Sequence, residues 1–311
     1  MKIAFFDSNP QDQETIQQGL AGHEVQIFSE SVNTINLEDI KNVQILSAFV
    51  KSKIGSDVIQ ALPDLRLIAT RSTGYDHIDL ATAKAKGVRV AYVPGYGDNT
   101  VAEYTFALIL TMTRKIYEGI SRVRSSGSFS LEHLKGTDLM GKTIGIVGTG
   151  RIGREVAKLA RAFGMKVICF DPHPDVLFAS TIGGSYLELS ELLAQSDIIS
   201  LHCPYLPSTH HLLNSQNLQF IKKGAILVNT SRGAVIETDA LVAVLKDGRL
   251  GGAALDVLEE EGQINEELRL LADGHPNEEQ LRVLLEDHIL MTMPNVYITP
   301  HNAFNTSEAL R

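Results

Sequence analysis

Cysteine is scarce in this sequence, and its scarcity excludes two kinds of stabilising chemistry. Only Cys169 and Cys203 occur among 311 residues. Two cysteines cannot form a disulfide framework, and no set of cysteines and histidines has the spacing of a zinc site. We therefore expect a protein without a resident metal that folds in a reducing compartment, the cytoplasm.

Excess positive charge and long apolar runs are also lacking. The formal net charge is −9, whereas proteins that bind nucleic acid use clusters of lysine and arginine. The most apolar run, YTFALILTM at 104–112, is too short to span a bilayer. The first residues, MKIAFFDSNPQ, lack the basic flank and cleavage site of a secretion signal. We expect neither a nucleic-acid partner nor membrane attachment.

The hydrophobic pattern alternates between strands and helices in two blocks, and the length suits two domains. Strand candidates in the first block are KIAFF, VQIF, VQILS, LRLIAT and VRVAYV. Those in the second block are KTIGIVG, KVICF, DIISLHC, AILVNTS, GGAALDV and VYITP. Apolar strands separated by helices indicate parallel sheets covered on both faces. The pattern predicts an α/β protein with two doubly wound parallel-sheet domains.

A long predicted helix separates the two blocks. It starts near Asn99 and continues through TVAEYTFALILTMTRKIYEGISRV. We place a first domain at 1–98, completed by the tail at 302–311, and a second domain at 99–301. The six strands of the second domain suit a nucleotide-binding sheet.

A glycine-rich loop opens the second block. The stretch KTIGIVGTGRIGREVAKLARAFG places Gly148, Gly150 and Gly153 in GxGxxG spacing, after a strand and at the start of a helix. The first glycine permits a tight turn, the second lets the backbone approach a pyrophosphate, and the third allows close packing of helix and strand. The helix N-terminus offers free N–H groups to a phosphate. This order of elements predicts a dinucleotide site.

The next strand, KVICF, ends at Asp171, 18 residues beyond Gly153. A carboxylate there can accept hydrogen bonds from a ribose 2′-hydroxyl and would repel a 2′-phosphate. The sequence therefore favours NAD over NADP as the cofactor. His173, two residues further on, leaves residual use of NADP open.

Six motifs together carry a resemblance that covers nearly the whole chain. In order they are STGYDHIDL, NTVAEYTFAL, GTGRIG, NTSRGAVI, AALDVLEEE and TPHNAF. The sequence resembles the D-isomer-specific 2-hydroxyacid dehydrogenase family, and VPGYGDNTVAEY and TPHNAFNT are most similar to its D-lactate dehydrogenase branch. The resemblance implies a Rossmann NAD-binding domain inserted in a flavodoxin-like substrate domain. It also implies an NAD-dependent oxidoreductase that interconverts pyruvate and D-lactate.

The same resemblance implies three catalytic residues, Arg232, Glu261 and His301. Reduction of a 2-oxo acid requires a proton for the carbonyl oxygen, and an imidazolium can deliver it near neutral pH. A carboxylate beside the histidine stabilises the protonated ring, which is the role implied for Glu261. The planar guanidinium of Arg232 suits a substrate carboxylate and the adjacent carbonyl. Because Glu259 and Glu260 adjoin Glu261, a neighbouring glutamate stays an alternative.

Two sets of binding residues are implied as well. The small 2-oxo or 2-hydroxy acid is expected to contact Ser72, Thr73, Gly74, Tyr96, Arg232, His301 and Phe304. Backbone N–H groups of the first three would hold its carboxylate. The dinucleotide is expected to contact Thr100, Gly148, Gly150, Arg151, Ile152, Gly153, Asp171, Cys203, Pro204, Thr209, Thr230, Ser231, Arg232 and Asp256. Cys203 is expected to contribute its backbone rather than a reactive sulfur.

The sequence departs from the family pattern in the segment between Glu261 and His301. This connection is longer than in many members and acidic, and glycine follows the glutamate where proline is common. The chain also stops at NTSEALR, where relatives continue into a helix. Alternative functions are reduction of a branched-chain 2-oxo acid, glyoxylate or hydroxypyruvate, or an NAD-sensing scaffold resembling the corepressor relatives. The segment 99–141 is expected to supply a homodimer interface, as it does in relatives.

Overall fold

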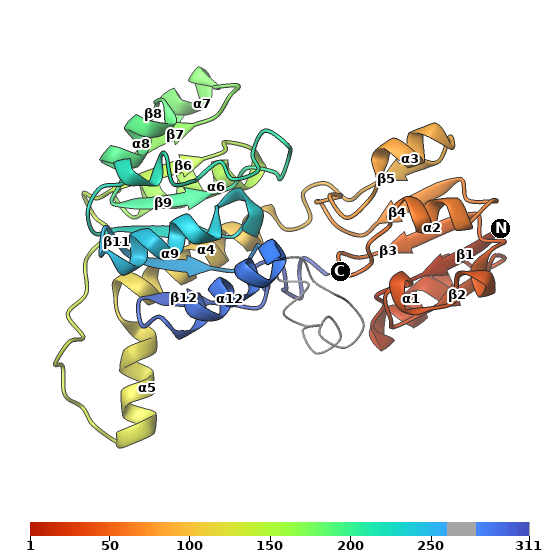
Figure 1. Cartoon of the computed structure of the whole chain (residues 1–311), viewed down its shortest axis with the longest axis horizontal. Coiled ribbons are helices and arrows are strands. Elements are labelled where there is room, and N and C mark those ends of the chain that lie inside the picture. Colours follow the sequence, from red (N-terminus) through yellow and green to blue (C-terminus); the bar gives the residue numbers. More distant parts are fainter. Residues whose placement is uncertain (260–277, 311) are drawn as a thin grey trace. The chain divides into compact units, whose positions relative to one another are not determined.

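The computed structural model describes residues 1–259 and 278–310, and the chain divides into two compact units between Tyr96 and Gly97 (Figure 1). This division lies two residues before the predicted border at 98. Residues 302–310 group with the second unit, where Asn302 and Ala303 donate backbone hydrogen bonds to Asp256. The expected completion of the first domain by this tail stays a prediction.

The first unit is a five-stranded parallel sheet in the order β2-β1-β3-β4-β5. This is the strand order of flavodoxin-like folds, with a switch point between β1 and β3. All five predicted strands are present. The strands are β1 (Lys2–Phe5), β2 (Glu24–Ile27), β3 (Ile45–Ala48), β4 (Leu67–Thr70) and β5 (Arg89–Ala91), and the helices are α1 (Pro10–Gly19), α2 (Ser56–Ala61) and α3 (Leu80–Ala85).

The second unit is a seven-stranded parallel sheet in the order β12-β11-β10-β9-β6-β7-β8. Read from β6 outward, this is the doubly wound order of nucleotide-binding folds, with a switch point between β6 and β9. The strands are β6 (Thr143–Val147), β7 (Lys166–Phe170), β8 (Ser185–Tyr186), β9 (Ile198–Leu201), β10 (Ala225–Asn229), β11 (Leu250–Leu255) and β12 (Val296–Ile298). The prediction missed β8, because a two-residue strand carries no periodicity.

Helices cover both faces of the second sheet, as the sequence predicts. The helices α4 (Asp98–Thr113) and α6 (Arg151–Ala162) pack together over one face, and α8 (Leu189–Gln195), α9 (Thr238–Lys246) and α12 (Glu278–Thr292) lie over the other. Within the described residues, this unit also contains the α-helices α5 (Ile116–Ser126) and α7 (Val176–Thr181). No helix within the described ranges is long and apolar enough to cross a membrane.

The single long helix predicted from Asn99 is wrong, because the structure breaks it between α4 and α5. The backbone carbonyl of Thr113 accepts a hydrogen bond of 2.8 Å from the N–H of Thr137. In a continuous helix that carbonyl would accept from residue 117. Lys115 instead adopts a left-handed conformation with φ +54°. A contact distant in sequence therefore ends α4.

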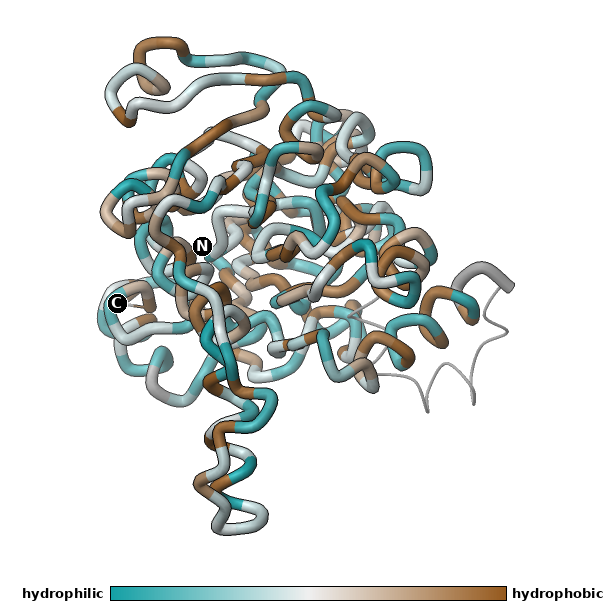
Figure 2. Tube along the Cα trace, turned by 90° about the vertical axis from the view of Figure 1, so that its left-hand side faces the viewer, coloured by the Kyte–Doolittle hydropathy of each residue, from teal (hydrophilic) through white to brown (hydrophobic). Residues whose placement is uncertain are grey.

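Beyond this break, α5 extends away from the sheet and buries none of its residues (Figure 1). Apolar side chains remain exposed along α5 and the loop after it: Ile116, Tyr117, Ile120, Val123, Phe129 and Leu131. Figure 2 shows hydrophobic and hydrophilic residues alternating along this arm, at the bottom of the view. The arm (residues 116–135) thus presents apolar area that its own unit does not cover.

The contact between α9 and α12 generates a testable dependence of stability on pH. Arg282 pairs with Asp239 at 2.8 Å, and burial, followed by the nearby Asp239 carboxylate, raises the pKa of Glu286 to about 7. Because the folded-state pKa lies above the usual value, the stabilising contribution is full below about pH 4.5 and lost as pH rises through 7. We expect Glu286→Gln to raise the melting temperature at pH 8 and to raise it much less at pH 5, where most of the contribution remains.

Thermal unfolding followed by circular dichroism at both pH values tests this. Glu14→Gln, at an exposed position on α1, is the control. An equal effect of Glu286→Gln at pH 5 and pH 8 would contradict the account.

Candidate active site

The residues predicted to act in the second unit follow consecutive strands of its sheet. Because the strands are parallel, their carboxyl ends share one edge, where ligands of such sheets bind. Across the sheet from β7 to β12, the residues at this edge are Asp171, Gly148, Cys203, Thr230 with Ser231 and Arg232, Asp256, and His301. Residues far apart in sequence are thereby brought to neighbouring strand ends.

The glycine loop between β6 and α6 has the close approaches that its spacing predicts. A Cβ on Gly153 would lie 2.0 Å from the carbonyl oxygen of Gly148, so only glycine lets the helix pack on the strand. Gly148 has φ +91°, and a Cβ there would lie 2.7 Å from the N of Cys203. A Cβ on Gly150 would meet no protein atom within 4 Å. The open side of Gly150, at the N-cap of α6, fits a pyrophosphate.

Asp171 lies at the end of β7 and already braces the glycine loop. Its Oδ2 accepts hydrogen bonds from the N–H of Thr149 at 2.8 Å and from the Thr149 hydroxyl at 3.0 Å. Its Oδ1 accepts from the N–H of His173 at 2.9 Å. A carboxylate accepts about four hydrogen bonds, so Asp171 keeps capacity for a ribose hydroxyl.

The segment after β9 supports the loop from the neighbouring strand. Cys203 is buried, and burial raises the pKa of its thiol to about 11, so the sulfur stays protonated and unreactive at neutral pH. Burial likewise lowers the pKa of His202 to about 3, which rules this histidine out as a proton donor near pH 7. The Thr209 hydroxyl donates to the carbonyl of Pro204 at 2.6 Å and fixes the following turn.

The loop after β10 is held by the buried side chain of Asn229. Its Oδ1 accepts from the N–H and hydroxyl of Ser231 at 3.0 and 2.8 Å, and its Nδ2 donates to the carbonyl of Arg232 at 2.9 Å. Arg232 Nη1 donates to the carbonyl of Ser231 at 2.8 Å. The Thr230 hydroxyl bonds Thr105 of α4 at 3.0 Å. The backbone that carries Arg232 is therefore fixed at its strand end.

Asp256 holds the loop that carries His301. Only 1% exposed, it accepts from the N–H groups of Asn302 and Ala303 at 2.9 and 2.8 Å and from the Thr299 hydroxyl. Burial raises the pKa of Asp256, and these donors and His301 oppose that rise. The N–H of His301 donates to the Asp256 carbonyl at 2.9 Å.

His301 itself has φ +49°, a left-handed conformation that costs a residue with a side chain roughly 1–3 kcal/mol. Its ring meets that of Phe304 edge to face, with centroids 5.9 Å apart. Such strain persists where surrounding bonds impose it, and it is frequent at functional sites. The Asp256 bonds supply that constraint here.

Of the three consecutive glutamates, only Glu259 lies within the described residues; Glu261 and Glu260 lie outside them. The Glu259 carboxylate pairs with His211 and accepts from the N–H and hydroxyl of Thr238 at 3.3 and 2.7 Å. Its two oxygens thus accept hydrogen bonds from His211 and from Thr238, the first residue of α9. This engagement makes Glu259 a poor candidate for the catalytic carboxylate.

Three further residues that the sequence assigns to the dinucleotide lie near the start of α4 and α6. Arg151 Nε donates to Asp98 Oδ2 at 2.6 Å, and the hydroxyls of Thr100 and Thr306 lie 3.5 Å apart. Ile152 is partly buried against the apolar core that α4 and α6 share. In the described part of the chain, no three His, Cys, Asp or Glu side chains are grouped to hold a metal ion.

In the first unit, Ser72, Thr73 and Gly74 form a turn directly after β4. The Ser72 hydroxyl donates to the carbonyl of Gly74, and the Thr73 hydroxyl donates to the carbonyl of Val93 at 3.0 Å. Tyr96, half-buried, is the last residue of this unit. The turn thus lies at the carboxyl edge of the first sheet.

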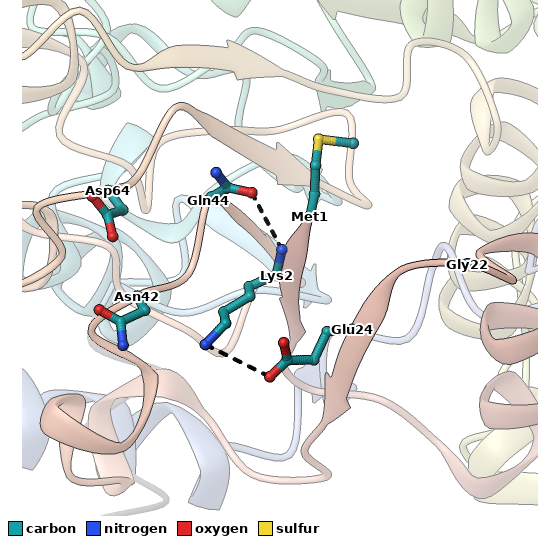
Figure 3. A pocket seen from close by; sticks show the side chains of 7 residues that line it. All are labelled: Met1, Lys2, Gly22, Glu24, Asn42, Gln44 and Asp64. Carbon is teal, nitrogen blue, oxygen red and sulfur yellow. Dashed lines mark hydrogen bonds and ion pairs between the residues drawn. The ribbon is translucent and has the colours of Figure 1, made fainter.

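A separate pocket of about 470 Å³ opens at the opposite edge of this sheet (Figure 3). It is lined by Met1, Lys2, Gly22, Glu24, Asn42, Gln44 and Asp64, and Lys2 is paired with Glu24 inside it at 3.8 Å. These residues lie at the amino ends of the strands. Since parallel sheets bind ligands at their carboxyl ends, this pocket is not the substrate site.

Comparison with known proteins decides the family. The model of the D-isomer specific 2-hydroxyacid dehydrogenase NAD-binding domain matches residues 106–303, which is most of the chain. This chain belongs to the D-isomer-specific 2-hydroxyacid dehydrogenase family. The dehydrogenase is accordingly an oxidoreductase that uses NAD, and the open side of Gly150 and the acceptor Asp171 fit that cofactor.

Individual relatives extend the match over the whole length of the dehydrogenase. A D-lactate dehydrogenase from Aquifex aeolicus, solved in complex with NAD and lactic acid, superposes with a TM-score of 0.89 at 36% identity, covering 99% of this chain and 90% of that one. The D-lactate dehydrogenase kk1H of Curvularia clavata is 37% identical, covering 100% of this chain and 88% of the relative. A glyoxylate reductase of Thermococcus litoralis is 41% identical, covering 75% of this chain and 72% of the relative.

Three supporting residues were not predicted from the sequence. Thr149, Asn229 and Thr299 hold the glycine loop, the Arg232 loop and the His301 loop in place. Each is a short polar residue at or just after the end of a strand. That position was a usable signal, because such side chains bond nearby backbone and shape loops.

The difference between Gly150 and Gly153 generates a prediction about cofactor binding. Gly150→Ala adds a methyl group toward open space, so we expect unchanged thermal stability and at least about a tenfold loss of NADH affinity, measured by fluorescence titration. Gly19→Ala, which also meets no atom within 4 Å, is the control and should leave NADH affinity unchanged. Full NADH affinity in Gly150→Ala would place the pyrophosphate elsewhere.

Proposed function

We propose that this dehydrogenase reduces pyruvate to D-lactate with NADH and runs the reverse reaction with NAD. The observation that carries the proposal is the pair of fixed loops on either side of β11. One presents Arg232 after β10, and the other presents His301 after β12. The likeness to D-lactate dehydrogenases, one of them solved with lactic acid, supports the choice of substrate.

In this proposal, NADH would supply a hydride to the carbonyl carbon of the oxo acid when bound. A side chain of the protein donates the proton that the carbonyl oxygen requires. The His301 imidazolium donates a proton to the carbonyl oxygen, and the neutral ring accepts it in the reverse direction. Glu261 stabilises the protonated ring and orients it. The left-handed backbone of His301 fixes the position of its Cβ atom. Fewer side-chain rotations are then needed to bring the imidazole to the substrate.

Charge on the substrate is neutralised by an arginine and by backbone N–H groups. The planar guanidinium of Arg232 donates two hydrogen bonds to the substrate carboxylate and polarises the adjacent carbonyl. The turn of Ser72, Thr73 and Gly74 donates N–H groups to the same carboxylate. The proposed contacts of the substrate side chain are Tyr96 of the first unit and Phe304 of the second.

The dinucleotide is proposed to lie along the carboxyl edge of the second sheet. Its pyrophosphate meets the backbone at Gly150, Arg151 and Ile152, and its ribose binds Asp171. The other proposed contacts are Thr100, Cys203, Pro204, Thr209, Thr230, Ser231, Arg232 and Asp256. Asp256 serves this region by shaping the loop as well, since its carboxylate already accepts from three residues.

A second substrate class has support of its own. The 41% identity to a glyoxylate reductase, over three quarters of the chain, keeps glyoxylate as an alternative to pyruvate. The chemistry at Arg232 and His301 would be the same for both acids. The difference would lie in the room left for the substrate methyl group.

We also propose that the protein is a cytoplasmic homodimer. The exposed apolar side chains of the arm support this, among them Phe129 at 85% and Leu131 at 82% exposed. Such side chains lose contact with water when a second copy covers them. Sedimentation equilibrium measures the assembly directly.

Turnover on a panel of acids tests the proposed function. NADH oxidation should be fastest with pyruvate among pyruvate, 2-oxobutyrate, 2-oxoisocaproate, phenylpyruvate, glyoxylate and hydroxypyruvate, and NADPH should be used poorly. The product from pyruvate should be the D isomer. Faster turnover of glyoxylate would move the substrate and keep the mechanism, whereas no turnover on any acid would refute the function.

Arg232 offers a test of the substrate contact. Arg232→Ala should lower kcat/KM for pyruvate by about a thousandfold or more, because a bidentate contact to the carboxylate is lost. Arg232→Lys keeps the charge without the fork and should recover only part of the activity. Affinity for NADH, measured by fluorescence, should fall far less than kcat/KM, because the dinucleotide keeps its other proposed contacts. Equal loss of NADH binding would make the arginine structural.

A further inference from the structure

The turn of Ser72, Thr73 and Gly74 is braced by a chain of side-chain hydrogen bonds that reaches back into the first unit. The Thr70 hydroxyl, on the last residue of β4, lies 2.6 Å from the Ser72 hydroxyl and 3.2 Å from Nε2 of His77. Thr70 and Ser72 are each only 2% exposed. Water therefore cannot replace these partners, so the buried hydroxyl groups must form their hydrogen bonds with one another and with His77.

The donor and the acceptor of each hydrogen bond in this series follow from one carbonyl group. The Ser72 hydroxyl donates its hydrogen to the Gly74 carbonyl, which can only accept. Thr70 must then donate to Ser72. With its own hydrogen used, Thr70 accepts from His77, so Nε2 of His77 carries a hydrogen. A histidine at the far end of the chain thereby determines how the hydroxyls point.

A second set of bonds fixes the direction of the turn amide. The Ser72 carbonyl accepts from the N–H of Val93, just beyond β5, at 3.1 Å. In a planar trans peptide the carbonyl and the following N–H point in opposite directions. The N–H of Thr73 therefore points away from Val93. A donor held this way is oriented before any ligand arrives, which lowers the cost of binding an anion.

Arg71 anchors the start of the same turn. Its guanidinium donates to the carbonyls of Phe6 and Asp7 at 2.7 and 3.1 Å and to the Ser47 hydroxyl at 3.1 Å. The two carbonyls directly follow β1, and Ser47 belongs to β3. Arg71, which follows β4, therefore connects the carboxyl ends of three strands. With the strand end anchored, the remaining freedom lies in residues 72–74.

We propose that Thr70 and His77 are positioning residues for the substrate carboxylate: their hydrogen-bond chain holds the Ser72–Gly74 turn with its amides aimed at the acid. This inference rests on the proposed function, since it takes the turn to bind the carboxylate. Neither residue touches the reacting atoms. Their effect is expected in the binding of the acid and not in the hydride step.

The experiment compares threonine variants in the full-length protein. Thr70→Val removes the hydroxyl and keeps the shape, so the KM for pyruvate should rise about tenfold, the equivalent of one hydrogen bond, with kcat within twofold. Binding of oxamate, an unreactive analogue of pyruvate, to the NADH complex should weaken by the same factor. The affinity for NADH alone should not change. Thr70→Ser keeps the hydroxyl and should restore both constants.

The matched control is Thr113→Val, which removes another buried hydroxyl, donated at 2.8 Å to the carbonyl of Ile109. It should leave oxamate affinity unchanged. Equal effects of Thr70→Val and Thr113→Val, or loss of NADH affinity in Thr70→Val, would overturn the positioning role.

Histidine variants serve if Thr70→Val fails to fold. His77→Gln keeps an N–H donor and His77→Leu does not, so only the leucine variant should lose oxamate affinity. Equal oxamate affinity in the two variants would reject the inference. A wild type that neither reduces any 2-oxo acid nor binds oxamate would refute the proposed function together with this inference. An active wild type with an unaffected Thr70→Val would refute this inference alone.

Discussion

The buried carboxylate of Asp256 is the constraint on which the active edge of the second sheet depends. It sits at the end of β11 and accepts hydrogen bonds from three residues of the segment after β12, so it joins two neighbouring strand ends. Burying a carboxylate is costly unless donors surround it, and here the donors are the backbone N–H groups of the His301 loop. The loop is therefore folded around the carboxylate. The left-handed backbone of His301 is a consequence of that arrangement.

The two sheets present backbone N–H groups at their carboxyl edges in related ways. In the second sheet, glycines remove side chains so that backbone N–H groups at the start of α6 can approach a pyrophosphate. In the first sheet, buried hydroxyls and an arginine hold a short turn so that an amide is already oriented. Both devices lie where parallel strands end. Both use backbone donors, which carry no net charge and suit a protein whose formal charge is −9.

Much of the fold could be predicted from sequence, because it follows from periodicity. The five strands of the first sheet and six of the seven in the second are apolar runs long enough to recognise, and the glycine spacing predicts the tight turn between β6 and α6. The break between α4 and α5 could not be predicted, since it depends on a hydrogen bond from Thr137, far along the chain. The same limit applied to Glu259. Its partner His211 lies 48 residues away in the sequence, so no local sequence pattern predicts that the two side chains pair.

The arm beyond α4 has a consequence for how this protein can change over time. The helix α4 ends at Thr113, and α5 contributes no buried residue to the core of the second unit. Apart from Tyr117 and Glu118, which contact Tyr297 of β12, substitutions on α5 therefore leave the sheet unstrained, while substitutions on α4 disturb packing against α6 and the sheet. Selection can thus act on the surface of the arm and on the chemistry of the sheet separately. Lineages with the same reaction are free to diverge in whatever contacts the arm makes.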